Sequence, residues 1–511
     1  MNRNEKIFLL VLTLLVAFAF QGSRGLYETT EGRYAEAARE MLQTGNWLIP
    51  QLDYKPHWTK PPLTYWAIAG GMMIFGENEW GARFYNAVAF VALTWTLVAL
   101  AKRLWDARTG YIAGLICATA PFLIVAENSV HTDMLLSLWG LLVVLCYWRL
   151  HKSSGTDDLR YWRAGFWLFA GLGFLTKGPP SVLILVVIGA FHVYLKRTGR
   201  PRPKMISALG LFLFLTVGLA WFLAVIFRTQ GLLDYYLHDE VYARIFTTQH
   251  NRNPQWYGPL VAYLPPLLLG AGPVVAVWPV LFRRERALFR RSRVFALLRE
   301  DDRATFLFLW LLIPVAVLSF ARSRLPLYVL PHFPVIVLAT ARAVVHLWDH
   351  PAAMRRISRL AAAMALVLVL AKGVSAYVPN QKDMRQLYTV CRSLGEGDTE
   401  YLAFDCEHLF GLQFYLKGQL TRIAFEPLPY YARQDVYSLI EEIKTSPVHD
   451  TYVFVVDHKR DIPVMQSLLE NAGLSPLLVE KARHYRVFVV RRSGGISDRA
   501  GKAQTDPAVL S

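Results

Sequence analysis

Three charged residues that could perform chemistry on an anionic substrate cluster at the start of the stretch YETTEGRYAEAAREML, residues 27–42. They are Glu28, Glu31 and Arg33, and they follow directly after a hydrophobic N-terminal segment. A carboxylate could act as a general base toward a hydroxyl group. The start of a helix beside a membrane span is also a place where an anion site could form.

The same stretch has the pattern of an amphipathic helix. Thr30 is a suitable N-cap, and Glu31 then lies in the first turn, where the helix dipole favours a carboxylate. Apolar residues repeat at helical spacing, namely Tyr34, Ala37, Ala38, Met41 and Leu42. We therefore expect a helix on the membrane surface, whose solvated face carries Glu36, Arg39 and Glu40.

The composition is that of an integral membrane protein. The chain has 511 residues, of which 54% are hydrophobic, with a formal net charge of +17. Since each span needs roughly 20 apolar residues, we expect an all-α polytopic protein with about 11 transmembrane helices and an upper limit of about 13. The candidates are 7–22, 83–101, 110–127, 132–150, 162–176, 179–196, 205–228, 257–281, 304–320, 326–346 and 358–378. The first lacks a small-x-small cleavage pattern, so an uncleaved signal anchor is favoured over a signal peptide.

Basic residues recur in every second loop of this arrangement. Placing Met1 in the cytoplasm puts five basic clusters on the inner side, as the positive-inside rule requires. Because these residues are spread over many loops rather than gathered on one face, the high charge does not indicate nucleic-acid binding.

After about residue 380 the hydropathy pattern changes. TEYLAFD, TYVFVVDH and YRVFVVRRS alternate like strands, while VYSLIEEIK and VMQSLLENAG have helical patterns. We expect a transmembrane domain over 1–379, with surface elements at about 22–82, then an outer α/β domain over 380–493 and a polar tail over 494–511. Cys391 and Cys406 both fall in the outer domain, where either a disulfide or two free thiols would be compatible with the compartment.

Five outward loops carry polar side chains that would converge on one membrane face. The first contains HWTKPPLTYW with Lys60, the second contains His131 and Asp133, and the third contains Lys177. The fourth, at about 230–256, contains Glu240, Arg244 and His250, and the fifth is ARSRLPLY with Tyr328. This convergence predicts a functional site at the outer face.

Five motifs in this order resemble a known family. EGRYAEAAREM, TGNWLIPQLDYKPHWTKPPLTYW, HTDMLL, FLTKGP and RLPLYVLPHFP are similar to the bacterial lipid-linked-sugar glycosyltransferases related to the lipid A aminoarabinose transferase and, more distantly, to protein O-mannosyltransferases. The resemblance covers about residues 5–345. It implies a GT-C fold and transfer of a sugar from an undecaprenyl-phosphate carrier to a periplasm-facing lipid, glycan or protein acceptor, in a bacterial inner membrane with the C-terminal domain in the periplasm.

The resemblance also implies roles for individual residues. It matches Lys60 to the family's phosphate-contacting lysine, Arg33 and Tyr34 to its Arg-Tyr pair, and Tyr328 to the tyrosine near the last motif. With Lys177, which could instead be only a positive residue in a tight turn, these residues are the candidates for contact with the donor phosphate. It suggests donor or acceptor contacts for Glu240, Arg244 and His250. The family usually has adjacent Asp-Glu before its Arg-Tyr pair, whereas this chain has Thr30-Glu31, so the catalytic carboxylate could be Glu28, Glu31 or Asp133.

Other interpretations of these residues stay open. Lys60 could extend toward lipid headgroups, and Asp133 could cap a helix. His131 and Asp133 could bind a divalent metal, although two ligands without a fixed spacing give no firm cofactor prediction. A transporter or flippase would instead need ionisable residues near the middle of its spans and repeated halves. The charges predicted here lie at one end of the spans.

Overall fold

The computed structural model describes residues 1–152, 159–247, 252–406, 408–425, 434–457, 461–479 and 485–491. The chain forms two compact units. The helical unit comprises Met1–Arg24, Ala37–Leu52 and Pro56–Val378, and the α/β unit comprises Gly25–Glu36, Asp53–Lys55 and Pro379–Ser511. The polar tail expected at 494–511 lies outside the described residues.

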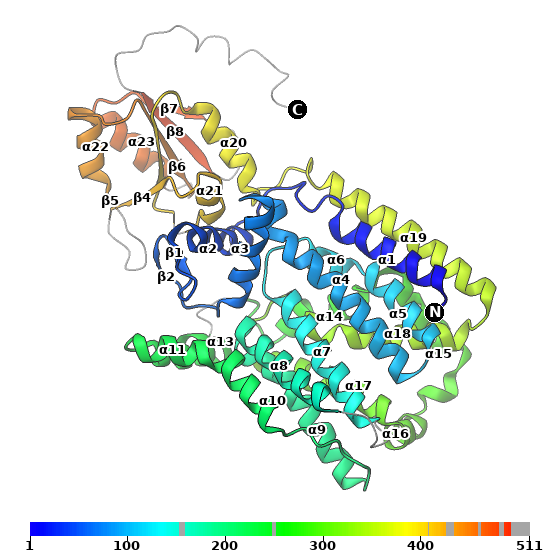
Figure 1. Cartoon of the computed structure of the whole chain (residues 1–511). Coiled ribbons are helices and arrows are strands. Elements are labelled where there is room, and N and C mark those ends of the chain that lie inside the picture. Colours follow the sequence, from blue (N-terminus) through cyan, green and yellow to red (C-terminus); the bar gives the residue numbers. More distant parts are fainter. Residues whose placement is uncertain are drawn as a thin grey trace. The chain divides into compact units, whose positions relative to one another are not determined.

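Helices make up almost the whole of the helical unit (Figure 1). In chain order they are α1 (Arg3–Phe18), α2 (Thr30–Thr44, which starts in the α/β unit), α3 (Leu63–Phe75), α4 (Glu79–Leu104), α5 (Ala107–Ala118), α6 (Pro121–Glu127), α7 (Asp133–His151), α8 (Arg160–Lys177), η1 (Pro179–Val182), α9 (Leu183–Arg197), α10 (Ala208–Leu213), η2 (Phe214–Leu219), α11 (Ala220–Arg228), α12 (Leu232–Tyr235), η3 (Tyr236–Tyr242), α13 (Ala243–Phe246), α14 (Gly258–Leu269), η4 (Gly272–Ala276), α15 (Val277–Arg284), η5 (Arg286–Phe289), α16 (Arg291–Glu300), α17 (Asp302–Phe320), η6 (Pro326–His332), α18 (Pro334–Leu347) and α19 (Pro351–Val374). Two short strands, β1 (Gln51–Leu52) and β2 (Lys55–Pro56), follow α2.

The helical unit is that of a multi-pass membrane protein. Among the described residues, six helices are long and apolar enough to cross a membrane, and the number rises to nine if each of three bent helix pairs is one span. Every segment expected to span contains a helix, but two of these helices differ from the others. Helix α1 has only 16 residues, and α8 carries three basic residues, Arg160, Arg163 and Lys177. The exact number of spans stays a prediction.

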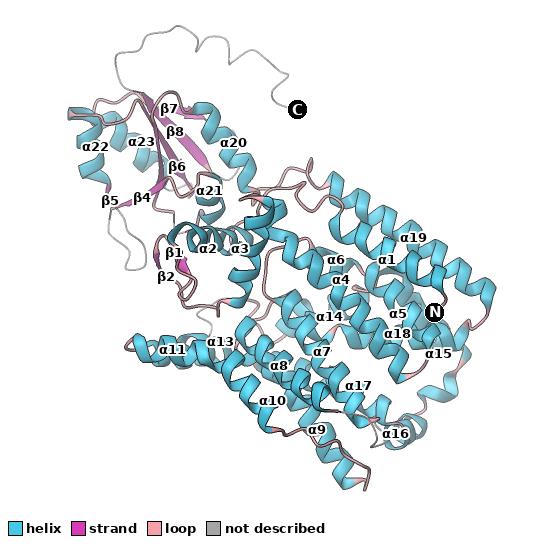
Figure 2. Cartoon of the chain, in the orientation of Figure 1, coloured by secondary structure: helices cyan, strands magenta, loops and turns pink. Residues whose placement is uncertain are grey.

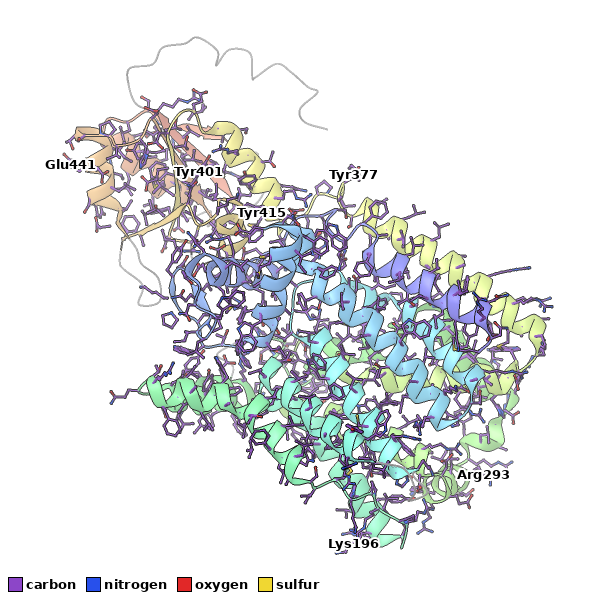
Figure 3. All side chains as sticks on the ribbon, viewed as in Figure 1. Lys196, Arg293, Tyr377, Tyr401, Tyr415 and Glu441 are labelled. Carbon is purple, nitrogen blue, oxygen red and sulfur yellow. The ribbon has the colours of Figure 1, made fainter. Side chains whose placement is uncertain are left out.

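Short polar side chains start several of the long helices. The side chain of Asn78 accepts a hydrogen bond from the Gly81 amide at the start of α4, and Asp106 accepts one from the Thr109 amide at the start of α5. These caps satisfy amides that have no partner within the helix. Lys196 and Arg293, from α9 and α16, lie at the same end of the helical unit (Figure 3). This grouping agrees with the basic loops expected on one membrane side.

The α/β unit contains a six-stranded mixed sheet with the strand order β5-β4-β3-β6-β8-β7. Figure 2 shows the strands of this unit in magenta. Strands β5, β4, β3 and β6 are parallel, whereas β8 pairs antiparallel with both β6 and β7. Its elements are α20 (Met384–Leu394), β3 (Thr399–Phe404), α21 (Phe410–Tyr415), β4 (Leu420–Ala424), β5 (Gln434–Asp435), α22 (Val436–Thr445), β6 (Thr451–Val456), α23 (Asp461–Asn471), β7 (Leu477–Val479) and β8 (Arg486–Arg491). The α/β character expected after residue 380 is confirmed.

Alternating residues of these strands enter two separate cores. Val453 and Val487 pack with α20 and α21 on one face, while Phe454 and Phe488 pack with α22 and α23 on the other. This alternation explains why the central strands are apolar on both faces, as is usual for a sheet covered by helices on both sides. Cys391 and Cys406 are both buried in the first core as free thiols, and burial raises the pKa of each to about 12.

Two expectations about residues 27–42 were wrong. Helix α2 begins at Thr30 itself, so Thr30 is a helical residue and not the N-cap. The charged residues assigned to a solvated face are instead buried, with Glu36, Arg39 and Glu40 each at most 2% exposed. The helix is therefore enclosed by protein on the side that hydropathy alone assigns to water.

Candidate functional site

An ion-paired cluster in the helical unit joins the first and fourth of the loops that the sequence predicts to face outward. Glu240 Oε2 accepts a hydrogen bond from Lys60 Nζ at 3.0 Å, and Glu240 Oε1 accepts one from Arg244 at 2.6 Å. The side chains of Lys60, Glu240 and Arg244 are 18%, 13% and 22% exposed. One carboxylate thus bridges two largely enclosed cations, Lys60, which is 180 residues away in sequence, and Arg244, which is four residues away.

The surroundings of this cluster change its proton affinities. Burial lowers the pKa of Lys60 to about 8, and the charge of Glu240 only partly opposes this effect. Burial disfavours ionisation of Glu240, but the adjacent charges of Lys60 and Arg244 outweigh it and lower the pKa of Glu240 to about 2. At neutral pH Lys60 is therefore mostly protonated, while Glu240 is fully ionised.

A second ion pair joins the second and third of these predicted outward loops. Lys177 Nζ donates a hydrogen bond to Asp133, and its ammonium lies 4.8 Å from the centroid of the Tyr328 ring. Both charged side chains are under 10% exposed. Lys177 also repels Lys60 electrostatically, which places the two ion pairs in one cluster.

Local backbone signals place these side chains at element ends. Asp133 is the first residue of α7, and Lys177 is the last residue of α8. Gly178 follows with φ = 71°, a left-handed conformation that glycine adopts without steric cost, and Pro179 then begins η1. Tyr328 lies in η6, which begins at Pro326. The helix ends therefore present three functional groups at one site.

His131 is fixed by hydrogen bonds on both sides of its ring. Its Nδ1 accepts from the Asp133 amide at 2.9 Å, and its Nε2 donates to the Ala126 carbonyl at 2.8 Å. These bonds occupy both nitrogens that could bind a metal. No group of three or more His, Cys, Asp or Glu side chains suited to a metal ion occurs among the described residues. His131 therefore fits the role of a loop-fixing residue better than that of a metal ligand.

Four of the predicted residues belong to the α/β unit. Glu28 is 6% exposed, and its Oε2 accepts a hydrogen bond from the Gly411 amide at 2.7 Å. Burial raises the pKa of Glu28 to about 7. Glu31 Oε2 accepts from the Tyr27 amide at 2.9 Å, which ties the first turn of α2 to the segment that precedes it. The Arg33 guanidinium lies 5.7 Å from the ring centroid of Tyr34.

The structure thus brings together six of the predicted residues in the helical unit, which are Lys60, Asp133, Lys177, Glu240, Arg244 and Tyr328. His250 lies outside the described residues. The sequence interpretation did not include Tyr236, whose buried hydroxyl lies near Glu240. Its position four residues before Glu240, in a loop rich in aromatic and charged residues, is the signal that could have identified it.

A buried polar network also lies in the helical unit. Lys372 Nζ donates to Glu127 Oε2 and to Gln21 Oε1, each at 3.1 Å. Arg83, which is fully buried, donates to the Gln21 carbonyl at 3.1 Å. Lys372 and Glu127 lie near the last residues of α19 and α6. Since these charges are at helix ends and not at mid-span, the network does not favour a transport pathway.

Comparisons with known proteins agree with the GT-C arrangement. The family model described as dolichyl-phosphate-mannose-protein mannosyltransferase matches residues 59–227. Two curated relatives are undecaprenyl phosphate-alpha-4-amino-4-deoxy-L-arabinose arabinosyl transferases. The one from Pseudomonas savastanoi pv. phaseolicola is 29% identical over 66% of this chain and 61% of its own length, and the one from Pseudomonas aeruginosa PAO1 is 30% identical over 65% and 59%. The chain therefore spans about three fifths of these relatives.

Solved structures show the same fold. ArnT from Cupriavidus metallidurans bound to undecaprenyl phosphate superposes with a TM-score of 0.74 at 18% identity, over 96% of this chain and 98% of that one. The oligosaccharyltransferase AglB from Archaeoglobus fulgidus, in complex with an inhibitory peptide and a dolichol-phosphate, superposes with a TM-score of 0.52 at 12% identity, over 98% and 76%. At these identities, the likeness establishes the fold.

Proposed function

We propose that the chain is a glycosyltransferase of the GT-C superfamily that includes aminoarabinose-transferase-like and protein-mannosyltransferase-like proteins, a proposal that its similarity to such proteins supports. Its donor is a sugar carried on undecaprenyl phosphate or a related polyprenyl phosphate. Its acceptor is a lipid A-type glycolipid, another glycan or a protein. The protein acts at the outer face of a bacterial inner membrane, with Met1 in the cytoplasm and the α/β unit in the periplasm.

The observation that carries this proposal is the pairing of Lys60 and Arg244 around one carboxylate. A lysine and an arginine that already hold an oxyanion have the chemistry needed for a phosphate oxygen. They lie in a largely enclosed site, where a charge interaction is stronger than in water. Phosphate binding here would stabilise the charge that develops as the carrier leaves.

The reaction breaks the bond between the anomeric carbon of the sugar and the carrier phosphate oxygen, which keeps the electron pair. An acceptor hydroxyl oxygen forms the new bond to that carbon, and its proton passes to a base. We assign this base role to Asp133, since Lys177 holds its carboxylate in the same cluster as Lys60. Lys177 and Tyr328 complete the proposed donor site in the helical unit.

Glu28 and Glu31 have weaker geometric support as the base. Glu31 accepts a hydrogen bond from the Tyr27 amide, and Glu28 accepts one from the Gly411 amide. These hydrogen bonds give both carboxylates a structural role, Glu28 within the α/β unit and Glu31 at the start of α2. We therefore propose that the aspartate replaced by Thr30 has no direct substitute in this turn, and that Asp133 provides the carboxylate.

Mass analysis of envelope glycolipids tests the proposed function. Cells with the intact protein should contain a glycolipid or glycan heavier by one sugar residue, which is missing when the protein is absent. Purified protein should then transfer sugar from a polyprenyl-phosphate-linked donor to the extracted acceptor. Identical envelope profiles with and without the protein, and no transfer in vitro, would rule the proposal out.

A further inference from the structure

Both carboxylate oxygens of Glu240 are occupied by cations. Oε2 pairs with Lys60 and Oε1 with Arg244, so Glu240 offsets one of the two positive charges assigned to phosphate binding. Arg244 lies four residues after Glu240, and this short spacing keeps the carboxylate beside the guanidinium. Glu240 is thus a permanent part of the charge of the site.

Two buried donors beside this carboxylate have capacity to bind another anion. Arg244 Nε and the Tyr236 hydroxyl have no hydrogen-bond partner among the described residues. An unsatisfied buried donor costs free energy, so each favours an acceptor that reaches it. The cluster can therefore bind a phosphate oxygen through Arg244 Nε and the Tyr236 hydroxyl while Glu240 stays paired with Lys60 and Arg244.

The ion pairs set the total charge of the cluster. Lys60, Arg244 and Lys177 are cations, and Glu240 and Asp133 are carboxylates, which leaves one net positive charge on these five side chains. A sugar-loaded carrier is a phosphodiester with one negative charge. The carrier released after transfer is a phosphomonoester, which carries between one and two negative charges near neutral pH because its second pKa is about 6.

We propose that Glu240 is a specificity-determining residue that makes the phosphate site prefer the sugar-loaded phosphodiester over the released phosphomonoester. This inference rests on the proposed function and extends it to the recognition of the two carrier states. The second negative charge of the monoester has to leave water in an enclosed site, and the Glu240 carboxylate repels it at short range and so offsets part of its attraction to Lys60 and Arg244. The product is thereby released, although it shares the lipid and one phosphate group with the donor.

The test measures binding of two synthetic probes to the purified full-length protein. One is a polyprenyl phosphate and the other is its methyl phosphodiester, so neither sugar identity nor catalysis affects the result. Glu240→Gln should shift the ratio of the two dissociation constants toward the monoester by about tenfold or more at pH 7. Asp234→Asn is the matched control, because Asp234 is an exposed carboxylate on α12 in the same loop, and it should leave the ratio unchanged.

A measurement on the unaltered protein keeps the test valid if Glu240→Gln does not fold. At pH 5 the monoester is mostly a monoanion, like the diester. Glu240, with a pKa of about 2, stays ionised at that pH, and Lys60 stays protonated. The preference for the diester seen at pH 7 should therefore disappear at pH 5.

The outcomes separate the two proposals. A ratio that shifts in Glu240→Gln but not in Asp234→Asn supports the role of Glu240, as does a preference that is lost at pH 5. Binding of both probes with a ratio that is the same in Glu240→Gln, or the same at pH 5 and pH 7, overturns this inference and leaves the glycosyltransferase proposal intact. Failure of both probes to bind the folded, unaltered protein overturns both proposals.

Discussion

Lys177 and Asp133 form an enclosed ion pair, although 44 residues separate them in the sequence. The Lys177 ammonium also lies 4.8 Å from the centre of the Tyr328 ring, a distance suited to a cation–π contact. The side chain at the end of α8 is therefore held by groups from α7 and η6. Lys177 fixes the direction of the Asp133 carboxylate, which links the position of the proposed base to that of the proposed donor site.

Asp133→Asn should lower turnover by about 10²-fold or more, because an amide cannot accept the acceptor proton. The variant keeps a hydrogen-bond acceptor for Lys177, so binding of the polyprenyl-phosphate donor should change much less. Turnover and donor affinity are measured separately in a purified transfer assay. Glu28→Gln and Glu31→Gln serve as comparisons and should retain most of the activity. Normal turnover in Asp133→Asn, with a large loss in Glu28→Gln or Glu31→Gln, would move the base to the start of α2.

Lys60→Ala should reduce sugar transfer by about 10²-fold or more, since the departing phosphate loses a cation in a largely enclosed site. Lys60→Arg should restore only part of the activity, because a planar guanidinium does not occupy the place of a compact ammonium. Lys55→Ala, five residues earlier in the same loop, is the control and should be active. The notion that Lys60 only extends toward lipid headgroups predicts instead that Lys60→Ala behaves like Lys55→Ala.

Local patterns predicted the elements but not all of their surroundings. Long apolar runs identified the helices of the membrane unit, and the strand-like patterns of TEYLAFD, TYVFVVDH and YRVFVVRRS identified β3, β6 and β8, because both signals reside within single segments. The solvated face assigned to α2 was wrong. Glu36 and Glu40 have helical spacing, but their burial depends on distant segments that cover the helix, and no local pattern encodes that covering.

Most residues of the candidate site were predicted from the expected membrane topology and not from local structure. Lys60 and Glu240 are separated by 180 residues, yet both were expected in outward loops, which places them on the same membrane face. Which loop residues pair could not be predicted, because the partner depends on how the helices pack. The inclusion of residues 25–36 in the α/β unit was also not predicted, since it depends on contacts such as that between Glu28 and Gly411.

Glu28 should make stability depend on pH. Its pKa is about 7 in the folded protein and 4.5 without burial, so between these values the folded state holds a proton that the unfolded state releases. The resulting stabilisation is fully present below pH 4.5 and is lost as the pH rises through 7. A shift of this size corresponds to at most about 3 kcal/mol.

Thermal unfolding of Glu28→Gln at pH 5 and pH 8 measures this contribution. Glutamine resembles the protonated carboxyl group and can still accept from the Gly411 amide. The variant should therefore unfold at a higher temperature than the parent protein at pH 8, with a smaller difference between the two pH values. Glu441→Gln, at an exposed position of α22 in the same unit, should keep the parental pH dependence. The same pH dependence in Glu28→Gln as in the parent would contradict this assignment.

Removal of Lys372 should destabilise the helical unit strongly. Lys372→Met leaves the Glu127 carboxylate, which is fully buried, without its cation, and an uncompensated buried charge typically costs about 3–5 kcal/mol. Lys372→Met combined with Glu127→Gln removes both charges and should recover a large part of the loss. The unfolding temperatures of the parent, the two single variants and the double variant form a double-mutant cycle.

Lys382→Met, at an exposed lysine, is the control and should leave the unfolding temperature unchanged. A structural pair predicts recovery of stability and of sugar transfer together in the double variant, whereas recovery of stability alone would show that one of the two charges also takes part in the reaction.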